Sequence, residues 1–134
     1  MKRVKLLLLA LLTGIILVGC SSSKLSDAFD EDTLKSRGKE VVDFFINEEF
    51  DKISAQMSDK MKESASPEEL EKTLKDTWDS IKGQLGKFEK ISKEGIVSEG
   101  DIAAIIEVVK FENGKIQFSI NYNENMELEG IFLK

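Results

Sequence analysis

The sequence predicts an α+β domain in which three N-terminal helices pack on one face of a four-stranded antiparallel sheet. Apolar residues recur at steps of three and four up to about residue 85, which is the period of a helix. After Gly86 the period changes to two, which is the period of a strand. Asn113-Gly114 lies between two such strands and indicates a two-residue hairpin turn. Helices that cover one face of a meander make a two-layer domain.

The first predicted helix covers residues 34–46. Its apolar residues follow helical spacing and are Leu34, Val41, Val42, Phe45 and Ile46. Gly38 interrupts this stripe and marks either close packing or a bend. A short second helix is expected next, with Asn47 as its cap. The apolar stripe of that second helix contains Phe50, Ile53, Met57 and Met61, as core residues or as an adaptable binding surface.

The third helix has the clearest local signal in the chain. Ser66 is the predicted cap, Pro67 suits the first helical position, and Glu69 stands where a capping-box acid belongs. One apolar stripe follows, made of Leu70, Leu74, Trp78, Ile81 and Leu85. The helix is expected to end near Gly83 or Gly86. We expect its single tryptophan, Trp78, to pack against the sheet.

Four strands are predicted after this helix. The first runs from Phe88 to about Val97, and Glu99-Gly100 forms the turn that follows it. Residues 102–111 are almost continuously apolar, which predicts a second strand buried on both faces. Residues 116–122 alternate between apolar and polar, which predicts a half-exposed third strand. Residues 126–132 form the last strand.

The N-terminus has the pattern of a secretion signal. A positively charged start precedes an apolar run over residues 6–18, which is too short to span a bilayer. The run ends in Leu17-Val18-Gly19-Cys20, which resembles the lipobox of bacterial lipoproteins. The resemblance implies that residues 1–19 are removed and that Cys20 carries palmitate-type acyl chains. It also implies a lipid anchor in the bilayer, with the protein at the extracytoplasmic face of the cell membrane.

Removal of residues 1–19 would leave one lipidated Cys20, a flexible acidic tether over residues 20–32 and one domain over residues 33–134. The whole chain has 19 basic and 25 acidic residues, and the acidic excess disfavours nucleic acid as a partner. There is no histidine, which removes the usual general base and the commonest zinc ligand. Cys20 is the only cysteine, so the domain is expected to fold without a disulfide. We expect no metal and no cofactor, and the oligomeric state stays open.

The order of helices and then meander resembles the cystatin-like, nuclear-transport-factor-2-like superfamily. That resemblance implies a curved sheet that wraps the helices into a cone with an apolar pocket. Residues 40–134 also resemble a bacterial domain of unknown function, number 3887. The residues that carry this second resemblance are Phe50-Asp51-Lys52-Ile53, residues 57–62, Ser66-Pro67-Glu68-Glu69-Leu70, Trp78, Gly86-Lys87-Phe88, residues 111–115 and Gly130-Ile131-Phe132. It implies an accessory or binding domain and supplies no catalytic residue.

The candidate pocket residues are Phe45, Met57, Trp78, Glu107, Phe118 and Tyr122. Glu107 interrupts an apolar strand, and two interpretations of it stay open. In one, it lies on the less covered face or pairs with Lys87 or Lys115. In the other, it is the acid/base of a small isomerase or dehydratase, which would also need a group such as Tyr122 to stabilise the developing charge. We expect the first, and therefore a non-enzymatic binding or accessory module for a small apolar ligand or an envelope protein.

Overall fold

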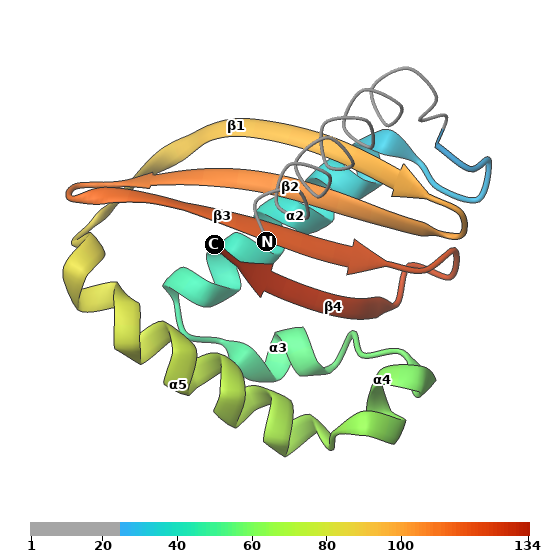
Figure 1. The fold of residues 1–134 in the computed structure, drawn as a ribbon, viewed down its shortest axis with the longest axis horizontal. Helices are drawn as coiled ribbons and strands as arrows, with labels where there is room; N and C mark the ends of the chain where they lie inside the picture. The colour runs from blue at the N-terminus through green and yellow to red at the C-terminus, as the bar shows by residue number, and fades with distance from the viewer. Residues whose placement is uncertain (1–24) are drawn as a thin grey trace, which may run out of the picture.

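The computed structural model describes residues 25–134, so the predicted signal peptide and Cys20 lie outside the described residues. Within residues 25–134, four helices come first and four strands follow, which confirms the predicted α+β class (Figure 1). The helices are α2 (Glu31–Ile46), α3 (Phe50–Ser54), α4 (Asp59–Ser64) and α5 (Pro67–Leu85). The strands are β1 (Phe88–Glu99), β2 (Ile102–Phe111), β3 (Gly114–Tyr122) and β4 (Leu128–Leu133).

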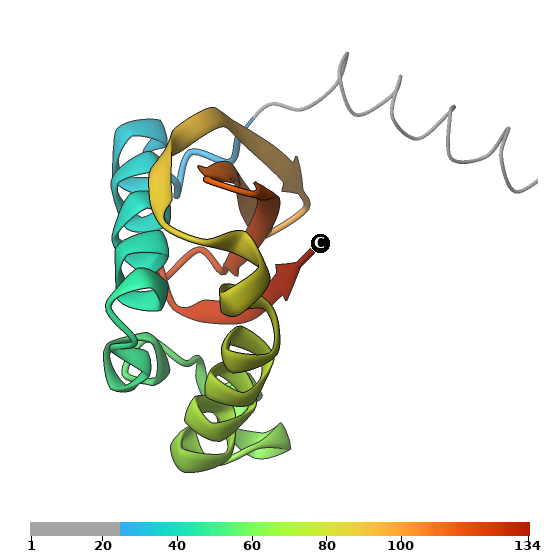
Figure 2. The same ribbon diagram turned by 90° about the vertical axis from the view of Figure 1, so that its left-hand side faces the viewer.

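The strands form one antiparallel meander in the order β1-β2-β3-β4. The sheet curls strongly, and α2 lies on its concave side (Figure 2). Among the described residues, no helix covers the opposite, convex side of the sheet (Figure 2). We call these two sides the concave face and the outer face.

Helix α2 begins three residues before the predicted start. The Asp30 carboxylate accepts hydrogen bonds from the backbone N–H and the hydroxyl of Thr33, at 3.0 and 2.7 Å, and so caps the helix. Phe29, which lies in the predicted tether, is buried with the core. Asn47 ends α2 and does not cap the next helix, because its N–H donates back to Asp43.

The second predicted helix is divided into α3 and α4. Between them, Met57 makes a parallel bridge with Leu128 of β4. The Ser58 N–H donates to the Leu128 carbonyl at 2.9 Å, and the Leu128 N–H donates to the Gln56 carbonyl at 2.6 Å. The Ser58 N–H and the Gln56 carbonyl are therefore bonded to β4 and cannot continue the helix. Ser58 instead caps the start of α4. Hydrogen bonds to a distant strand outweigh the local helical spacing here.

The signals of the third predicted helix are confirmed in α5. The Ser66 hydroxyl accepts from the Glu69 N–H at 3.2 Å, and Pro67 occupies the first turn. The helix ends at Gly86, which has φ 76°. A Cβ there would lie 3.0 Å from the Asn113 side chain and 3.0 Å from Glu112 Oε1. Both the backbone angle and the available space therefore require glycine.

The β2–β3 hairpin forms as predicted, but its turn is one residue earlier. Phe111 and Gly114 are the last paired residues, so Glu112 and Asn113 make the turn. Neither residue has positive φ. The reason is long-range: the Glu112 carboxylate accepts from the Lys87 N–H at 2.7 Å, and the Asn113 N–H donates to the Leu85 carbonyl at 2.9 Å.

The prediction that β2 is buried on both faces is wrong. Its odd-numbered residues are buried on the concave face, whereas its even-numbered residues are only half-buried. The physical reason is that the described helices cover one side of the sheet. The apolar residues at even positions, Ile102, Ala104, Ile106 and Val108, therefore belong to the outer face.

A register shift in the β3–β4 ladder sets the orientation of the last residues. Tyr122 pairs with Leu128, but Asn121 pairs with Gly130, so β4 has one extra residue there. Beyond this bulge, Leu133 stands opposite Phe118 and Phe132 stands opposite Ser119. Phe132 is consequently on the outer face and is 61% exposed.

Candidate functional site

The concave face, where the predicted pocket lies, is filled by aromatic side chains of the protein. The Phe45 ring is 5.5 Å from Phe50, 5.6 Å from Trp78 and 5.1 Å from Phe118, measured between centroids. All three contacts are edge-to-face, the arrangement that aromatic rings favour. Trp78 also lies 6.0 Å from Phe111 of β2, which confirms that it packs between α5 and the sheet. Phe45, Trp78 and Phe118 thus come together as core residues.

Tyr122 and Met57 are also buried, near the end of the sheet where α3 and α4 lie. The Tyr122 hydroxyl donates to Gln56 Oε1 at 2.8 Å. Burial raises the pKa of Tyr122, so this hydroxyl stays protonated. Tyr122 pairs with Ala103, four residues along β2 from Glu107, which is about 13 Å in a strand. The structure therefore does not bring Tyr122 to Glu107.

The expectation that Glu107 lies on the less covered face or pairs with a lysine is wrong. Glu107 is fully buried on the concave face, between Glu94 of β1 and Phe118 of β3 in the register of the sheet. Its neighbours along β2 on that face are Ile105 and Val109, whereas Lys115 pairs with Lys110, on the other face. Neither Glu107 oxygen accepts a hydrogen bond from a donor within the described residues.

Glu94 is the functional residue that sequence reasoning missed. It is directly opposite Glu107 in the β1–β2 ladder, and its Oε2 is buried without a donor. The turn predicted at Glu99-Gly100 is one residue too early, because Gly100 and Asp101 make the turn between the paired residues Glu99 and Ile102. Counting back from that turn along both strands puts residues 94 and 107 opposite each other. We call these two residues the carboxyl pair.

Helix α2 lies against Glu107 of the carboxyl pair at Gly38. A Cβ at Gly38 would lie 2.8 Å from Glu107 Oε1 and 2.7 Å from Ile105 Cγ1. Real Cβ atoms do not approach that closely, so only glycine permits this packing. Of the two roles predicted for Gly38, close packing is confirmed.

The environment of the carboxyl pair favours a proton on Glu107. Burial first, and then the hydrogen bond and the charge of Glu94, raise the pKa of Glu107 to about 9. The Lys39 ammonium acts in the opposite direction and more weakly. The raised pKa therefore favours the protonated form of Glu107 near neutral pH.

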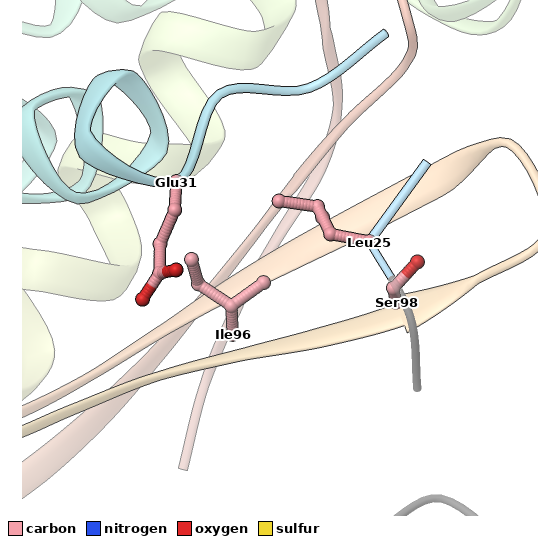
Figure 3. A pocket seen from close by; sticks show the side chains of 4 residues that line it. All are labelled: Leu25, Glu31, Ile96 and Ser98. Atoms are coloured by element: carbon pink, nitrogen blue, oxygen red, sulfur yellow. The ribbon is translucent and has the colours of Figure 1, made fainter. Parts of the chain in front are cut away.

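A small hollow lies close to the carboxyl pair, where α2 starts. It has a volume of about 200 Å³ and is lined by Leu25, Glu31, Ile96 and Ser98 (Figure 3). Ile96 and Ser98 follow Glu94 on the same side of β1. The Glu31 carboxylate forms an ion pair with Lys35 at 2.9 Å, and Glu107 does not line the hollow.

The outer face of the sheet combines apolar and basic residues. Val97 is 53% exposed and pairs with Ala104 of β2, whereas Phe132 is 61% exposed on β4 and stands opposite Ser119 of β3. The Phe132 ring lies over Gly130, at 3.3 Å from where a Cβ would stand. At one end of this face, Lys90, Lys110 and Lys115 are in register on three neighbouring strands. Like charges in register are unfavourable unless another group offsets them.

Comparison with known families identifies the chain. The family described as "Protein of unknown function (DUF3887)" matches residues 38–131, and the chain belongs to this family. Among proteins with curated descriptions, none matches the chain. The chain is similar in fold to a solved structure titled "NMR structure of protein from Ruminococcus gnavus ATCC 29149". That similarity has a TM-score of 0.61 at 21% identity, over 81% of this chain and 95% of the other.

These comparisons indicate no enzyme family. Within residues 25–134, no group of three or more possible ligand side chains is placed to hold a metal ion. No helix in the same part of the chain is long and apolar enough to cross a membrane.

Proposed function

We propose that this protein is a lipid-anchored accessory domain that binds a partner protein of the cell envelope through the outer face of its sheet. The observation that carries the proposal is the contrast between the two sides of the sheet. The concave face is filled by buried aromatic residues, whereas the outer face has apolar residues without cover from any described helix. Exposed apolar surface of this kind is typical of protein–protein contact.

The anchor rests on the sequence. Leu17-Val18-Gly19-Cys20 follows a short apolar run, and a lipid on Cys20 would hold the domain at the extracytoplasmic face of the membrane. Cys20→Ser should release the protein from membranes or leave an uncut precursor. A Cys20→Ser protein that fractionates and migrates like the wild type would contradict the anchor.

The basic residues of the outer face indicate the surface chemistry of the partner. Lys90, Lys110 and Lys115 border the apolar part of the outer face, and of these Lys110 has an ion pair with Glu89 at 3.2 Å. A partner with acidic side chains beside an apolar patch fits this surface. A small apolar ligand in the cone fits less well, because the aromatic rings occupy that space.

The enzyme alternative has one observation in its favour, the burial of Glu107, which raises the pKa of its carboxyl group. A proton-transfer enzyme also needs a group that stabilises the charge developing on the substrate. Tyr122, the candidate for that role, is engaged by Gln56 and is placed elsewhere on the sheet. The geometry therefore favours binding over catalysis.

Site-specific photo-crosslinking in intact cells tests the proposal. A photoreactive residue at Val97 or at Phe132 should form an adduct with the same envelope protein. The matched control is the same residue at Asp76, an exposed position on α5. Phe132→Ser should weaken the adduct formed from position 97 by about tenfold, as loss of a central apolar contact does. Equal adducts from position 76, or no protein adduct from the outer face, would contradict the proposal.

A further inference from the structure

The carboxyl pair is the most unusual arrangement in the described part of the chain. Glu94 and Glu107 face each other across two strands, where opposed Cβ atoms lie about 5 Å apart. Glu107 is fully buried, and neither of its oxygens has a donor among residues 25–134. Two carboxylates in such a place cannot both be ionised without a large cost.

The surroundings offer little to stabilise a second negative charge. On β3, the residue opposite Glu107 is Phe118, which is apolar. On α2, Lys39 is exposed, and Lys35 is engaged by Glu31 while it also feels the charges of Glu94 and Asp32. Within the described residues, these are the charged groups that act on Glu107 and on Lys35. A shared proton is therefore what satisfies Glu94 and Glu107.

We propose that the carboxyl pair is a proton-dependent latch between α2 and the sheet. When the pair holds its proton, the Glu107 carboxylic acid donates to the Glu94 carboxylate and α2 packs closely over both at Gly38. When the proton leaves to solvent, two adjacent carboxylates remain and require water. Gly38 blocks water on the α2 side, so α2 moves away from β1 and β2.

Helix α2 is the element that shifts, because it takes no part in the hydrogen bonds of the β1–β4 ladders. Its shift is confined to the part around Gly38, since Phe29 before it and Phe45 near its C-terminal end are buried in the core. Helix α2 also follows the segment that would carry the lipid anchor. This inference concerns the coupling of α2 to the sheet and stands independently of the proposed partner.

Limited proteolysis with trypsin tests the latch. Helix α2 contains three cleavable residues, Lys35, Arg37 and Lys39. We compare the full chain in detergent with Glu107→Gln at pH 6.5 and at pH 8.5. Comparing two proteins at the same pH cancels the pH dependence of trypsin. Cleavage after Lys72 and Lys75 of α5 serves as an internal reference, because that helix does not cover the pair.

The wild type should be cleaved in α2 faster than Glu107→Gln already at pH 6.5, which lies above the ordinary pKa of a glutamate. This excess should grow by up to about 100-fold from pH 6.5 to pH 8.5, because proton linkage changes an equilibrium by at most about tenfold per pH unit. In the Glu107→Gln variant, the new amide donates to Glu94 in place of the acid, so cleavage of its α2 should follow the α5 reference. Glu94→Gln should also reduce the difference, because its amide donates to the Glu107 carboxylate.

The matched control is Glu99→Gln, an exposed glutamate at the end of the same strand, and it should behave as the wild type does. Equal α2 cleavage of wild type and Glu107→Gln at pH 8.5 would overturn the latch. A second result would also overturn it. If calcium chloride at pH 8.5 protects the wild type but neither glutamine variant, the pair is a cation site and not a proton site.

Discussion

Glu94 and Glu107 lie directly opposite each other on the side of the sheet that α2 covers, and the only glycine of α2 stands over Glu107. Because the folded chain keeps a proton that the unfolded chain loses, this arrangement links folding to pH. The consequences are measurable in the stability of the whole domain and not only in the position of α2.

We expect the free energy of unfolding to fall as the pH rises between about 4.5 and 9. The pKa of Glu107 is about 9 in the native state and 4.5 in the unfolded reference, so unfolding releases a proton throughout that window. The stabilisation is complete below pH 4.5 and is lost as the pH passes 9. The slope is at most about 1.4 kcal/mol per pH unit.

Urea unfolding at pH 5.5, 7.0 and 8.5, followed by Trp78 emission, measures this slope. Glu107→Gln should remove most of it. The lowered pKa values of Asp30 and Asp79 act below pH 4 and do not overlap with the window. A wild-type protein whose stability rises from pH 5.5 to 8.5 would contradict the assigned pKa.

Gly38→Ala should destabilise the protein by about 1–3 kcal/mol, the usual cost of overpacking. The added methyl group would meet Ile105 at 2.7 Å and Glu107 at 2.8 Å. Gly83→Ala in α5 is the matched control, because nothing lies within 4 Å of a Cβ there. It should stabilise by about 0.5–1 kcal/mol, since alanine favours the helix. Equal effects of both substitutions on the melting temperature would mean that α2 does not pack as described.

Trp78→Ala should cost about 3–5 kcal/mol, as removal of a buried large aromatic residue does. Trp78 is 3% exposed and contacts Phe45, Phe111 and Phe118. Circular dichroism during thermal unfolding measures the loss, with the exposed neighbour Thr77→Ala as control. The native wild-type protein should also show blue-shifted tryptophan emission. Emission at the wavelength of free tryptophan would place the residue in water and refute the assignment.

Tyr122→Phe should cost about 0.5–1.5 kcal/mol, because it leaves the Gln56 amide oxygen without its donor. The double variant Tyr122→Phe with Gln56→Leu separates this bond from general packing. If the hydroxyl acts only through Gln56, the phenylalanine substitution should cost much less in the Gln56→Leu background. Additive losses would show that the 2.8 Å hydrogen bond does not stabilise the fold.

Local chemistry explains which elements were predictable. Ser66 and Pro67 act within one helical turn, so α5 could be located from the sequence alone. The interruption of the expected helix at Met57 could not be predicted, since it is caused by hydrogen bonds to Leu128, about 70 residues away. The apolar run in β2 does not reveal which face the helices leave open.

The candidate site was predicted only in part, for the same physical reason. Phe45, Trp78 and Phe118 were expected together, and they are together, but as packed core. Glu107 was singled out as an acid among apolar residues, yet its orientation depends on the register of two ladders. Glu94 looks like an ordinary surface glutamate until that register is known.

The extra residue in β4 determines what the outer face offers to another protein. In an unbroken ladder, Phe132 would stand opposite Phe118 and join the interior, and Leu133 would turn outward instead. The bulge next to Gly130 reverses the orientation of both side chains. The Phe132 ring is therefore exposed because β4 has one extra residue, and not because an apolar residue was added. Deletion of Glu129, the residue without a partner, would close the bulge but leave Gly130 opposite Asn121 and Phe132 opposite Ser119, so the most exposed aromatic group of the sheet would stay on the outer face.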